Sequence, residues 1–343
     1  MKDPQNIAVI GVSGYTGFEL AKILLRHPEA KSLTFYVRET EGAHCLTELF
    51  PQLRGWGQAP LRALSPDAVS RSQAGTAFLA TPHEVSSEMA PRLLDAGLRV
   101  VDLSGAFRFR EAETFRRWYK LPTPHAAWLG DAVYGLPEFY SQQIRHARLV
   151  ANPGCYATSV ILALRPLAEA GWIAAGSSVV CDSKSGATGA GKELRRDLQF
   201  AELDENFKAY SLFSHRHTPE ITEHTGLPES QVVFSTHLLP LARGILSTIY
   251  VTLAEPQSPE AVEALFRKTY AGRKMIRISK AGILPELQHV AHTNFADIGF
   301  ALDSSGRRLV IVSCLDNLGK GAAGQAVQNF NHLLGVEEQT GLK

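Results

Sequence analysis

Apolar and polar positions alternate in two different ways along this chain, and the change falls near residue 150. Before that point, short apolar runs are separated by stretches in which apolar residues recur with the 3.6-residue period of a helix. The predicted strands are 6–10, 33–37, 76–81 and 99–104, and the predicted helices are 18–28 and 86–97. Such alternation is typical of right-handed β-α-β units. We therefore predict an α/β fold with a Rossmann-type, doubly wound parallel sheet over 1–150.

The second half of the chain has apolar runs with fewer helices between them. Strands are predicted at 177–183, 231–239, 244–254 and 307–315, and helices at 158–171 and 321–335. This pattern favours a mixed or antiparallel sheet with helices on one face. We expect an α+β catalytic and oligomerisation domain over 151–315. A C-terminal loop and helix, 316–343, should pack back on the first domain.

Composition narrows the classes of function. The 343 residues are 45% hydrophobic and carry 35 basic against 34 acidic side chains, a net charge of +1. This balance argues against a nucleic-acid or membrane-surface partner recruited by charge, and it favours a small diffusible substrate. No run approaches the roughly 20 apolar residues of a membrane span, and no signal peptide is visible, so a cytoplasmic protein is expected. The four cysteines are too widely spaced for a disulfide framework or a zinc site.

A glycine-rich loop follows the first predicted strand. Its sequence, G-V-S-G-Y-T-G from Gly11 to Gly17, stands between a strand and a helix. Glycines let the backbone approach a pyrophosphate, and a helix N-terminus supplies N–H donors, so this loop predicts dinucleotide binding; a tight turn without a ligand is the alternative. The next strand ends at Arg38, with Glu39 and Thr40 beyond it. A cation suits the 2′-phosphate of NADP, although Arg38 could also be merely solvated.

A second glycine-rich loop nearly spells another function. Residues 186–192, G-A-T-G-A-G-K, fit the phosphate-binding loop of NTPases. That loop requires Ser or Thr next, as a magnesium ligand, but this chain has Glu193. The mismatch argues against an NTPase.

The segment around Cys155 carries the strongest chemical signal. Asn152-Pro-Gly predicts a turn, and a helical pattern follows, so Cys155 should stand at a helix N-terminus. There the helix dipole lowers the pKa of a thiol and favours the nucleophilic thiolate. The alternative, an inert buried cysteine, suits Cys181 and Cys314, which lie in predicted apolar strands.

A thiolate nucleophile needs a partner that manages protons. His215 and His217 lie just before a predicted helix, for which Thr218 could be the N-cap and Pro219 the first helical residue. A metal site formed with His224 is conceivable, but it lacks matching carboxylate or cysteine ligands, and we expect no metal. We therefore take His217 as the acid/base.

These motifs resemble the N-acetyl-γ-glutamyl-phosphate reductase family of arginine synthesis, which belongs with the aspartate-semialdehyde dehydrogenases. The matching segments are G-V-S-G-Y-T-G from Gly11, V-D-L-S-G-A-F-R to Arg108, Y-G-L-P-E to Glu138, N-P-G-C-Y-A-T around Cys155, H-R-H-T-P-E-I around His217, R-G-I-L-S-T from Arg243 and N-L-G-K-G-A-A-G-Q-A-V-Q-N from Asn317. Two segments depart from the family: Lys192 replaces an arginine, and 82–86 is P-H-E-V-S rather than P-H-G-V-S.

The resemblance implies reduction of an acyl phosphate to an aldehyde with NADP(H), with Cys155 as nucleophile and His217 as acid/base. The expected cofactor residues are Gly11, Ser13, Gly14, Tyr15, Thr16, Gly17, Arg38, Ser104, Gly186 and Asn317. The expected substrate residues are Arg108, Asn152, Glu220 and Arg243, of which the two arginines would hold phosphate and carboxylate unless they form structural salt bridges. Glu220 would orient His217, or only complete a helical turn.

Other functions remain open at this point. The same machinery could reduce an aspartyl or α-aminoadipyl phosphate, because only the substrate pocket would differ. A non-catalytic nucleotide sensor would keep the glycine loops but gain nothing from a nucleophile and a base. The apolar strands of the second sheet also predict a homodimer or homotetramer.

Overall fold

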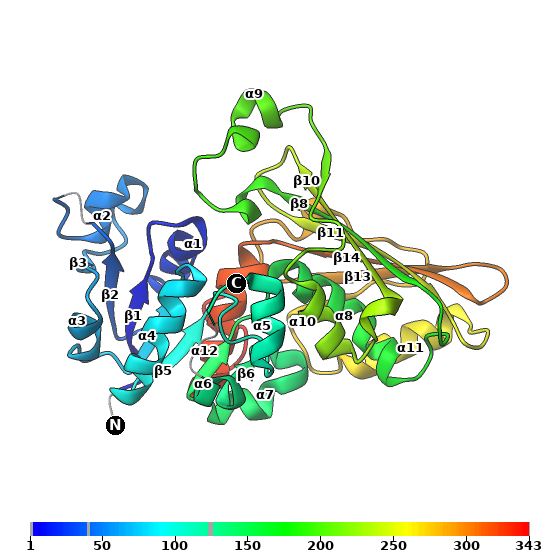
Figure 1. The fold of residues 1–343 in the computed structure, drawn as a ribbon, viewed down its shortest axis with the longest axis horizontal. Coiled ribbons are helices and arrows are strands. Elements are labelled where there is room, and N and C mark those ends of the chain that lie inside the picture. Colours follow the sequence, from blue (N-terminus) through cyan, green and yellow to red (C-terminus); the bar gives the residue numbers. More distant parts are fainter. Residues whose placement is uncertain (1–2, 40–41, 123–125, 343) are drawn as a thin grey trace. The chain divides into compact units, whose positions relative to one another are not determined.

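The computed structural model describes residues 3–39, 42–122 and 126–342 (Figure 1). In it the chain divides into two compact units. The first unit comprises Met1–Pro153 and Ala322–Lys343. The second comprises Gly154–Gly321. The chain therefore leaves the first unit just before Cys155 and re-enters it near its C-terminus.

The first unit is built on a parallel sheet of order β3-β2-β1-β4-β5-β7-β6. Its strands are β1 Asn6–Ile10, β2 Ser32–Val37, β3 Leu61–Ala63, β4 Thr76–Leu79, β5 Arg99–Asp102, β6 Val133–Tyr134 and β7 Leu149–Ala151. Successive residues of β1 enter different cores: Ile7 and Val9 pack on one face, and Ala8 and Ile10 on the other. Because apolar cores cover both faces, the predicted doubly wound sheet is confirmed.

Helices pack against both faces of this sheet and complete its two apolar cores. They are α1 Tyr15–Leu24, α2 Leu46–Leu49, α3 Pro66–Ser70, α4 His83–Asp95, α5 Ala112–Tyr119, α6 Ala126–Asp131, α7 Pro137–His146 and the C-terminal α12 Gly324–Leu334. Val327 and Phe330 of α12 share a core with Ile7 and Val9, so the end of the chain stabilises the sheet formed by its beginning.

The second unit is built on a mixed sheet of order β12-β13-β14-β11-β8-β10-β9. Its strands are β8 Val179–Gly186, β9 Lys208–Tyr210, β10 Val232–Leu239, β11 Ile245–Thr252, β12 Ile276–Ile278, β13 Ala296–Leu302 and β14 Arg308–Leu315. β8 pairs with β10, and β12 with β13, in parallel; the other neighbouring pairs are antiparallel. The predicted mixed sheet is confirmed.

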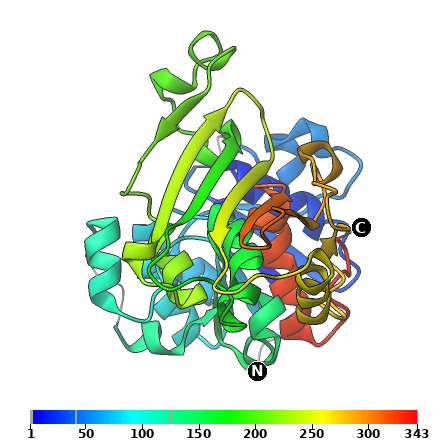
Figure 2. The same cartoon turned by 90° about the vertical axis from the view of Figure 1, so that its right-hand side faces the viewer.

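One face of this sheet is covered by helices and the other is open (Figures 1 and 2). The helices of the second unit are α8 Cys155–Glu169, α9 Phe200–Leu203, α10 Thr218–Thr225 and α11 Pro259–Thr269, and α8 packs on β11 and β14. Alternate residues of β8, β10 and β11 are buried, while most of those between them are partly or largely exposed. We call the side they form the open face. Across the described residues, no helix is long and apolar enough to cross a membrane.

Two differences from the predicted elements have local causes. β13, sequence A-D-I-G-F-A-L, was not predicted because Asp297 and Gly299 interrupt its apolar pattern. Helix α10 begins at Thr218, so its N-cap is His217 and the prediction of Thr218 as N-cap is wrong by one residue. No side chain caps this helix, and the shift places the histidine itself at the helix end.

Candidate functional site

Cys155 is the first residue of α8, as its sequence context predicts. The preceding residue, Gly154, is the N-cap in an extended conformation, and no side chain caps the helix. The thiol is partly buried, whereas Cys181 and Cys314 are buried in β8 and β14. Burial raises the pKa of both of these thiols, that of Cys314 to about 12. Among these three cysteines, only Cys155 therefore combines access with a helix N-terminus.

His217 lies directly against the residue before the nucleophile. A Cβ on Gly154 would be 2.4 Å from His217 Nε2 and 2.6 Å from its Cδ2 and Cε1. Only glycine leaves room for the imidazole at this position. A second close approach exists at Gly321, where a Cβ would be 2.9 Å from Cβ of Cys155. The absence of side chains at Gly154 and Gly321 thus allows the imidazole and a backbone turn to lie beside the start of α8.

Glu220 lies close to both the turn before Cys155 and the imidazole of His217. Its side chain is fully buried on α10, one turn after His217. Oε2 accepts a hydrogen bond of 2.9 Å from the backbone N–H of Gly154, and Oε1 is 3.9 Å from His217 Nε2. A buried carboxylate in this position stabilises a positively charged imidazole and also fixes the turn before Cys155.

A layer of rings backs this group. His215 Nδ1 accepts a hydrogen bond of 3.1 Å from the backbone N–H of His217, and its ring packs edge-on against that of Tyr156. Burial, helped by the nearby charges of His217 and Arg216, lowers the pKa of His215 to about 2. His215 is therefore neutral at physiological pH and acts as an acceptor that holds the backbone of His217.

Arg243 and Asn317 lie in a neighbouring loop cluster with Gly186. Arg243 Nη1 forms an ion pair of 3.1 Å with the buried Asp316. Asn317 Oδ1 accepts from the backbone N–H of Gly244 at 2.8 Å, and its Nδ2 donates to Thr188 Oγ1 at 2.9 Å. The side chain of Asn317, expected on the cofactor, thus braces the loop after β8. That loop continues into a 3-10 turn rather than a long helix, unlike an NTPase phosphate loop.

The first glycine-rich loop connects β1 to α1 in the first unit. Gly11 has φ +85°, and a Cβ there would be 2.3 Å from the carbonyl oxygen of Ala80. Gly14 is the N-cap of α1, and no side chain caps this helix either. The uncapped N–H groups at the C-terminal edge of a parallel sheet fit the pyrophosphate of a dinucleotide. Ser13 and Tyr15 are exposed there, Thr16 is partly buried, and Gly17 is buried.

Arg38 lies at the same edge of that sheet. It follows the last residue of β2, the strand that pairs with β1, and it is exposed together with Glu39. An exposed guanidinium at this edge can contact a 2′-phosphate. Thr40, the small polar neighbour considered with it, lies outside the described residues.

Ser104, Arg108 and Asn152 form a brace at the ends of β5 and β7. Ser104 Oγ donates to Asp102 Oδ2 at 2.8 Å, and burial raises the pKa of Asp102. Arg108 Nε donates to the carbonyl oxygen of Asn152 at 2.8 Å. Asn152 Oδ1 accepts from Asn329 Nδ2 at 2.9 Å. All three side chains are buried, so they hold the edge of the sheet where ligands of this fold bind.

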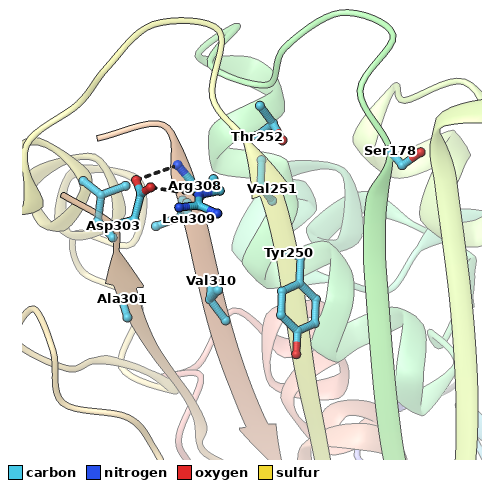
Figure 3. A pocket seen from close by; sticks show the side chains of 10 residues that line it. Ser178, Tyr250, Val251, Thr252, Ala301, Asp303, Arg308, Leu309 and Val310 are labelled. Carbon is cyan, nitrogen blue, oxygen red and sulfur yellow. Dashed lines mark hydrogen bonds and ion pairs between the residues drawn. The ribbon is translucent and has the colours of Figure 1, made fainter. Parts of the chain in front are cut away.

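A cavity of about 500 Å³ lies elsewhere, on the open face of the second sheet (Figure 3). Tyr250, Val310 and the ion pair between Asp303 and Arg308 line it. No predicted site residue contributes to its lining. This hollow therefore belongs to the open face and not to the group around Cys155.

Some parts of the site were not predicted. The approach of His217 to Gly154, the contact at Gly321 and the ring layer behind His215 emerge only in the folded chain. The sequence contains a signal for the first of these, because the glycine directly before Cys155 leaves space for another side chain. Among the residues that the structure describes, no cluster of His, Cys, Asp and Glu could hold a metal ion.

Comparison with known proteins identifies the family. The semialdehyde dehydrogenase NAD binding domain matches residues 6–147, and the semialdehyde dehydrogenase dimerisation domain matches residues 155–317. The N-acetyl-γ-glutamyl-phosphate reductase of Desulfotalea psychrophila is 43% identical over 98% of this chain and 97% of its own. That of Pelotomaculum thermopropionicum is 42% identical with the same coverage. The chain belongs to the N-acetyl-γ-glutamyl-phosphate reductase family.

Solved structures agree with this family at the level of the fold. Aspartate semialdehyde dehydrogenase II from Vibrio cholerae aligns with a TM-score of 0.74 and 18% identity over 96% of this chain and 98% of that one. An aspartate semialdehyde dehydrogenase with NADP from Candida albicans aligns with a TM-score of 0.68 and 16% identity over 97% and 99%. This chain thus has the same fold as these enzymes, and its first unit contains the matched NAD binding domain.

Proposed function

We propose that this protein reduces N-acetyl-γ-glutamyl phosphate to N-acetylglutamate semialdehyde with NADPH, in arginine biosynthesis, through a thioester on Cys155. The observation that carries the proposal is the contact of the His217 imidazole with Gly154, at the start of α8. This contact supports a pair formed by a base and a thiol at a helix N-terminus. Family membership over nearly the whole chain supports the substrate.

The first step is acyl transfer to Cys155. The thiolate attacks the acyl carbon, the C–S bond forms, and the C–O bond to phosphate breaks. Phosphate leaves with the electron pair of that bond and takes up a proton. The helix N-terminus of α8 stabilises the thiolate before attack.

The second step reduces the thioester. When bound, NADPH would supply the hydride for reduction of the thioester carbon and would leave as NADP⁺. His217 then donates a proton to the developing oxyanion, which gives a thiohemiacetal on Cys155. His217 next takes the hydroxyl proton back while the C–S bond breaks, so that the aldehyde leaves and the thiolate is restored. Glu220, 3.9 Å from His217 Nε2, stabilises the protonated imidazole.

Binding roles follow from the fit of the residues to the ligands. The backbone of the Gly11–Gly17 loop and the start of α1 would hold the pyrophosphate of NADPH, and Arg38 its 2′-phosphate. Arg243 forms an ion pair with Asp316 and is our candidate for binding an anionic group of the substrate. Arg108 and Asn152, held in the brace, would shape the substrate side of the first unit.

A second copy of the chain completes the proposal. The matched dimerisation domain spans residues 155–317, which include the whole open face. Partly apolar sheets are normally covered by another layer, and two such faces pack sheet on sheet. We therefore propose a homo-oligomer, either a dimer or a tetramer.

The test is the reverse reaction, phosphate-dependent reduction of NADP by N-acetylglutamate semialdehyde. Cys155→Ser should lower kcat by roughly 10³-fold or more. Cys45→Ser, which removes a partly buried thiol outside the site, is the matched control and should keep wild-type rates. Turnover with aspartate semialdehyde alone would replace the substrate and keep the mechanism. Activity that persists in Cys155→Ser would refute the nucleophile.

A further inference from the structure

An exposed apolar segment leaves the second sheet close to the candidate site. We call residues 190–213 the arm; it contains α9 and β9 and loops beyond the ends of β8 and β10 (Figures 1 and 2). Within the described part of the chain, ten large apolar side chains are exposed, and half of them belong to the arm. These five are Leu194, Phe200, Phe207, Leu212 and Phe213. Such a concentration marks an interaction surface.

The backbone of the arm indicates that its support lies outside the chain. Ser211 and Phe213 have positive φ, 49° and 56°, which side-chain-bearing residues rarely adopt. A bulky residue keeps this conformation only where its surroundings hold it. Phe213 is 76% exposed and Phe200 is 80% exposed. Contacts within one chain therefore leave these rings largely uncovered.

The charge and position of the arm favour a second copy of this chain as the occupant. The arm carries four basic and five acidic side chains, which does not suit a polyanion or an anionic membrane. It lies wholly inside the matched dimerisation domain, residues 155–317. It is also continuous with the open face, because β9 pairs with β10 and the Phe207 ring is 5.2 Å from that of His237.

Both ends of the arm are tied to the candidate site. Two residues before its start, Thr188 Oγ1 donates to the carbonyl oxygen of Ala242 and accepts from Asn317. At its end, Tyr210 Oη donates to the hydroxyl of Tyr156, the residue after Cys155, at 3.3 Å. The Tyr210 ring also packs 5.8 Å from that of His215, which holds the backbone of His217. A movement of the arm would therefore reach the neighbours of both proposed catalytic residues.

We propose that the arm docks onto a second copy of this chain and that this contact holds the nucleophile and the base in their reactive arrangement. The inference rests on the proposed function for its kinetic readout. Its docking step does not, because assembly is measured without substrate.

The experiment compares the full-length wild type with Leu194→Ser/Phe200→Ser. Sedimentation over a dilution series should show the variant dissociating at a concentration at least about 10-fold higher than the wild type, the effect of removing two apolar contacts. kcat should fall about 10-fold or more, while KM for NADP in the first unit stays the same. Ile283→Ser/Leu284→Ser, which removes exposed apolar side chains outside the arm, is the matched control and should change neither value.

Hydrogen exchange provides a measurement that needs no variant. Amides of the arm should be protected at high wild-type concentration and lose protection on dilution. A variant with wild-type assembly and wild-type kcat would overturn the inference, as would dissociation with full kcat or arm exchange that ignores concentration. A wild type that assembles as described but neither reduces the acyl phosphate nor oxidises the aldehyde would refute the proposed function alone.

Discussion

Helices α1 and α8 begin in the same way and are suited to different chemistry. Each follows an extended glycine N-cap, Gly14 or Gly154, and neither has a side-chain cap. Around Gly14 there is space: a Cβ would meet nothing closer than the carbonyl oxygen of Gly11, at 3.7 Å. Around Gly154 there is none, because the ring of His217 occupies it. The first helical residue is an exposed tyrosine in α1 and the candidate nucleophile in α8.

The comparison shows what an uncapped helix N-terminus contributes by itself. In both helices it offers N–H donors and the positive end of a dipole. In α1 the donors are left for an anionic ligand. In α8 the N–H of Gly154 already donates to the buried carboxylate of Glu220, and the N–H of His217 donates to His215 in the ring layer. The neighbours of the helix start, rather than the start itself, decide between binding and catalysis.

Within this comparison of the two helix starts, the largest expected effect comes from adding one methyl group at each N-cap. Gly154→Ala would place Cβ 2.4 Å from His217 Nε2, so the imidazole must move by about 1 Å, which lowers kcat about 10²-fold. Gly14→Ala has room for its methyl within the protein and should mainly weaken NADPH binding. The measurement is steady-state kinetics of both variants.

A half-reaction separates the two sites further. Phosphate release from the acyl phosphate, without cofactor and with stoichiometric enzyme, depends on Cys155 and not on the α1 loop. It should be slowed in Gly154→Ala and unchanged in Gly14→Ala. Equal loss in both variants would contradict the division of roles between the two helices.

The next effect concerns the carboxylate that α1 lacks. Glu220→Gln keeps the shape of the side chain and an oxygen for the Gly154 N–H, but it removes the charge near His217. The expected loss is about 30-fold in kcat, equivalent to about 2 kcal/mol for a hydrogen bond to a charged group. Pre-steady-state kinetics should place this loss in the hydride step. An unchanged kcat would show that Glu220 only fixes the turn.

Much of this comparison was predictable from the sequence, because both helix starts have local signatures. A strand, a glycine turn and a helical period define the α1 loop, and Asn-Pro-Gly-Cys before an apolar helix defines the start of α8. The ring of His217 reaches Gly154 from a segment about 60 residues later in the chain, and no local pattern encodes that contact. Asn317 and Ser104 are expected on the cofactor by resemblance, and this stays a prediction; the fold adds that their side chains form hydrogen bonds within the protein, which no local pattern indicates.

A smaller effect is expected for Arg38, which belongs to the proposed cofactor site of the first unit. Arg38→Ala should raise KM for NADPH about 10-fold, equivalent to about 1.4 kcal/mol, because one charge-assisted contact to the 2′-phosphate is lost. KM for NADH and both kcat values should not change. Arg71→Ala removes another exposed arginine of the first unit and serves as the control. Equal changes with NADH and NADPH would contradict a contact to the 2′-phosphate.

The smallest expected effect is on the free energy of unfolding rather than on the rate. It tests the ring layer formed by His215 and Tyr156. The pKa of His215 is lowered by burial to about 2 from an ordinary value of 6.5. Below pH 6.5 the unfolded chain therefore binds a proton at His215 that the folded chain does not. The stability present above pH 6.5 is lost by about 1.4 kcal/mol per pH unit as the pH falls.

His215→Phe keeps the ring packing against Tyr156 but removes this titration and the acceptor for the His217 N–H, a loss of about 1 kcal/mol. Urea denaturation should thus find the variant less stable than wild type at pH 8 and more stable at pH 5, where the wild type has lost about 2 kcal/mol through this residue. His146→Phe, at an exposed position of α7, should give the wild-type profile. A constant difference between His215→Phe and wild type at both pH values would mean that His215 takes up a proton in the folded protein, and the neutral acceptor behind His217 would have to be abandoned.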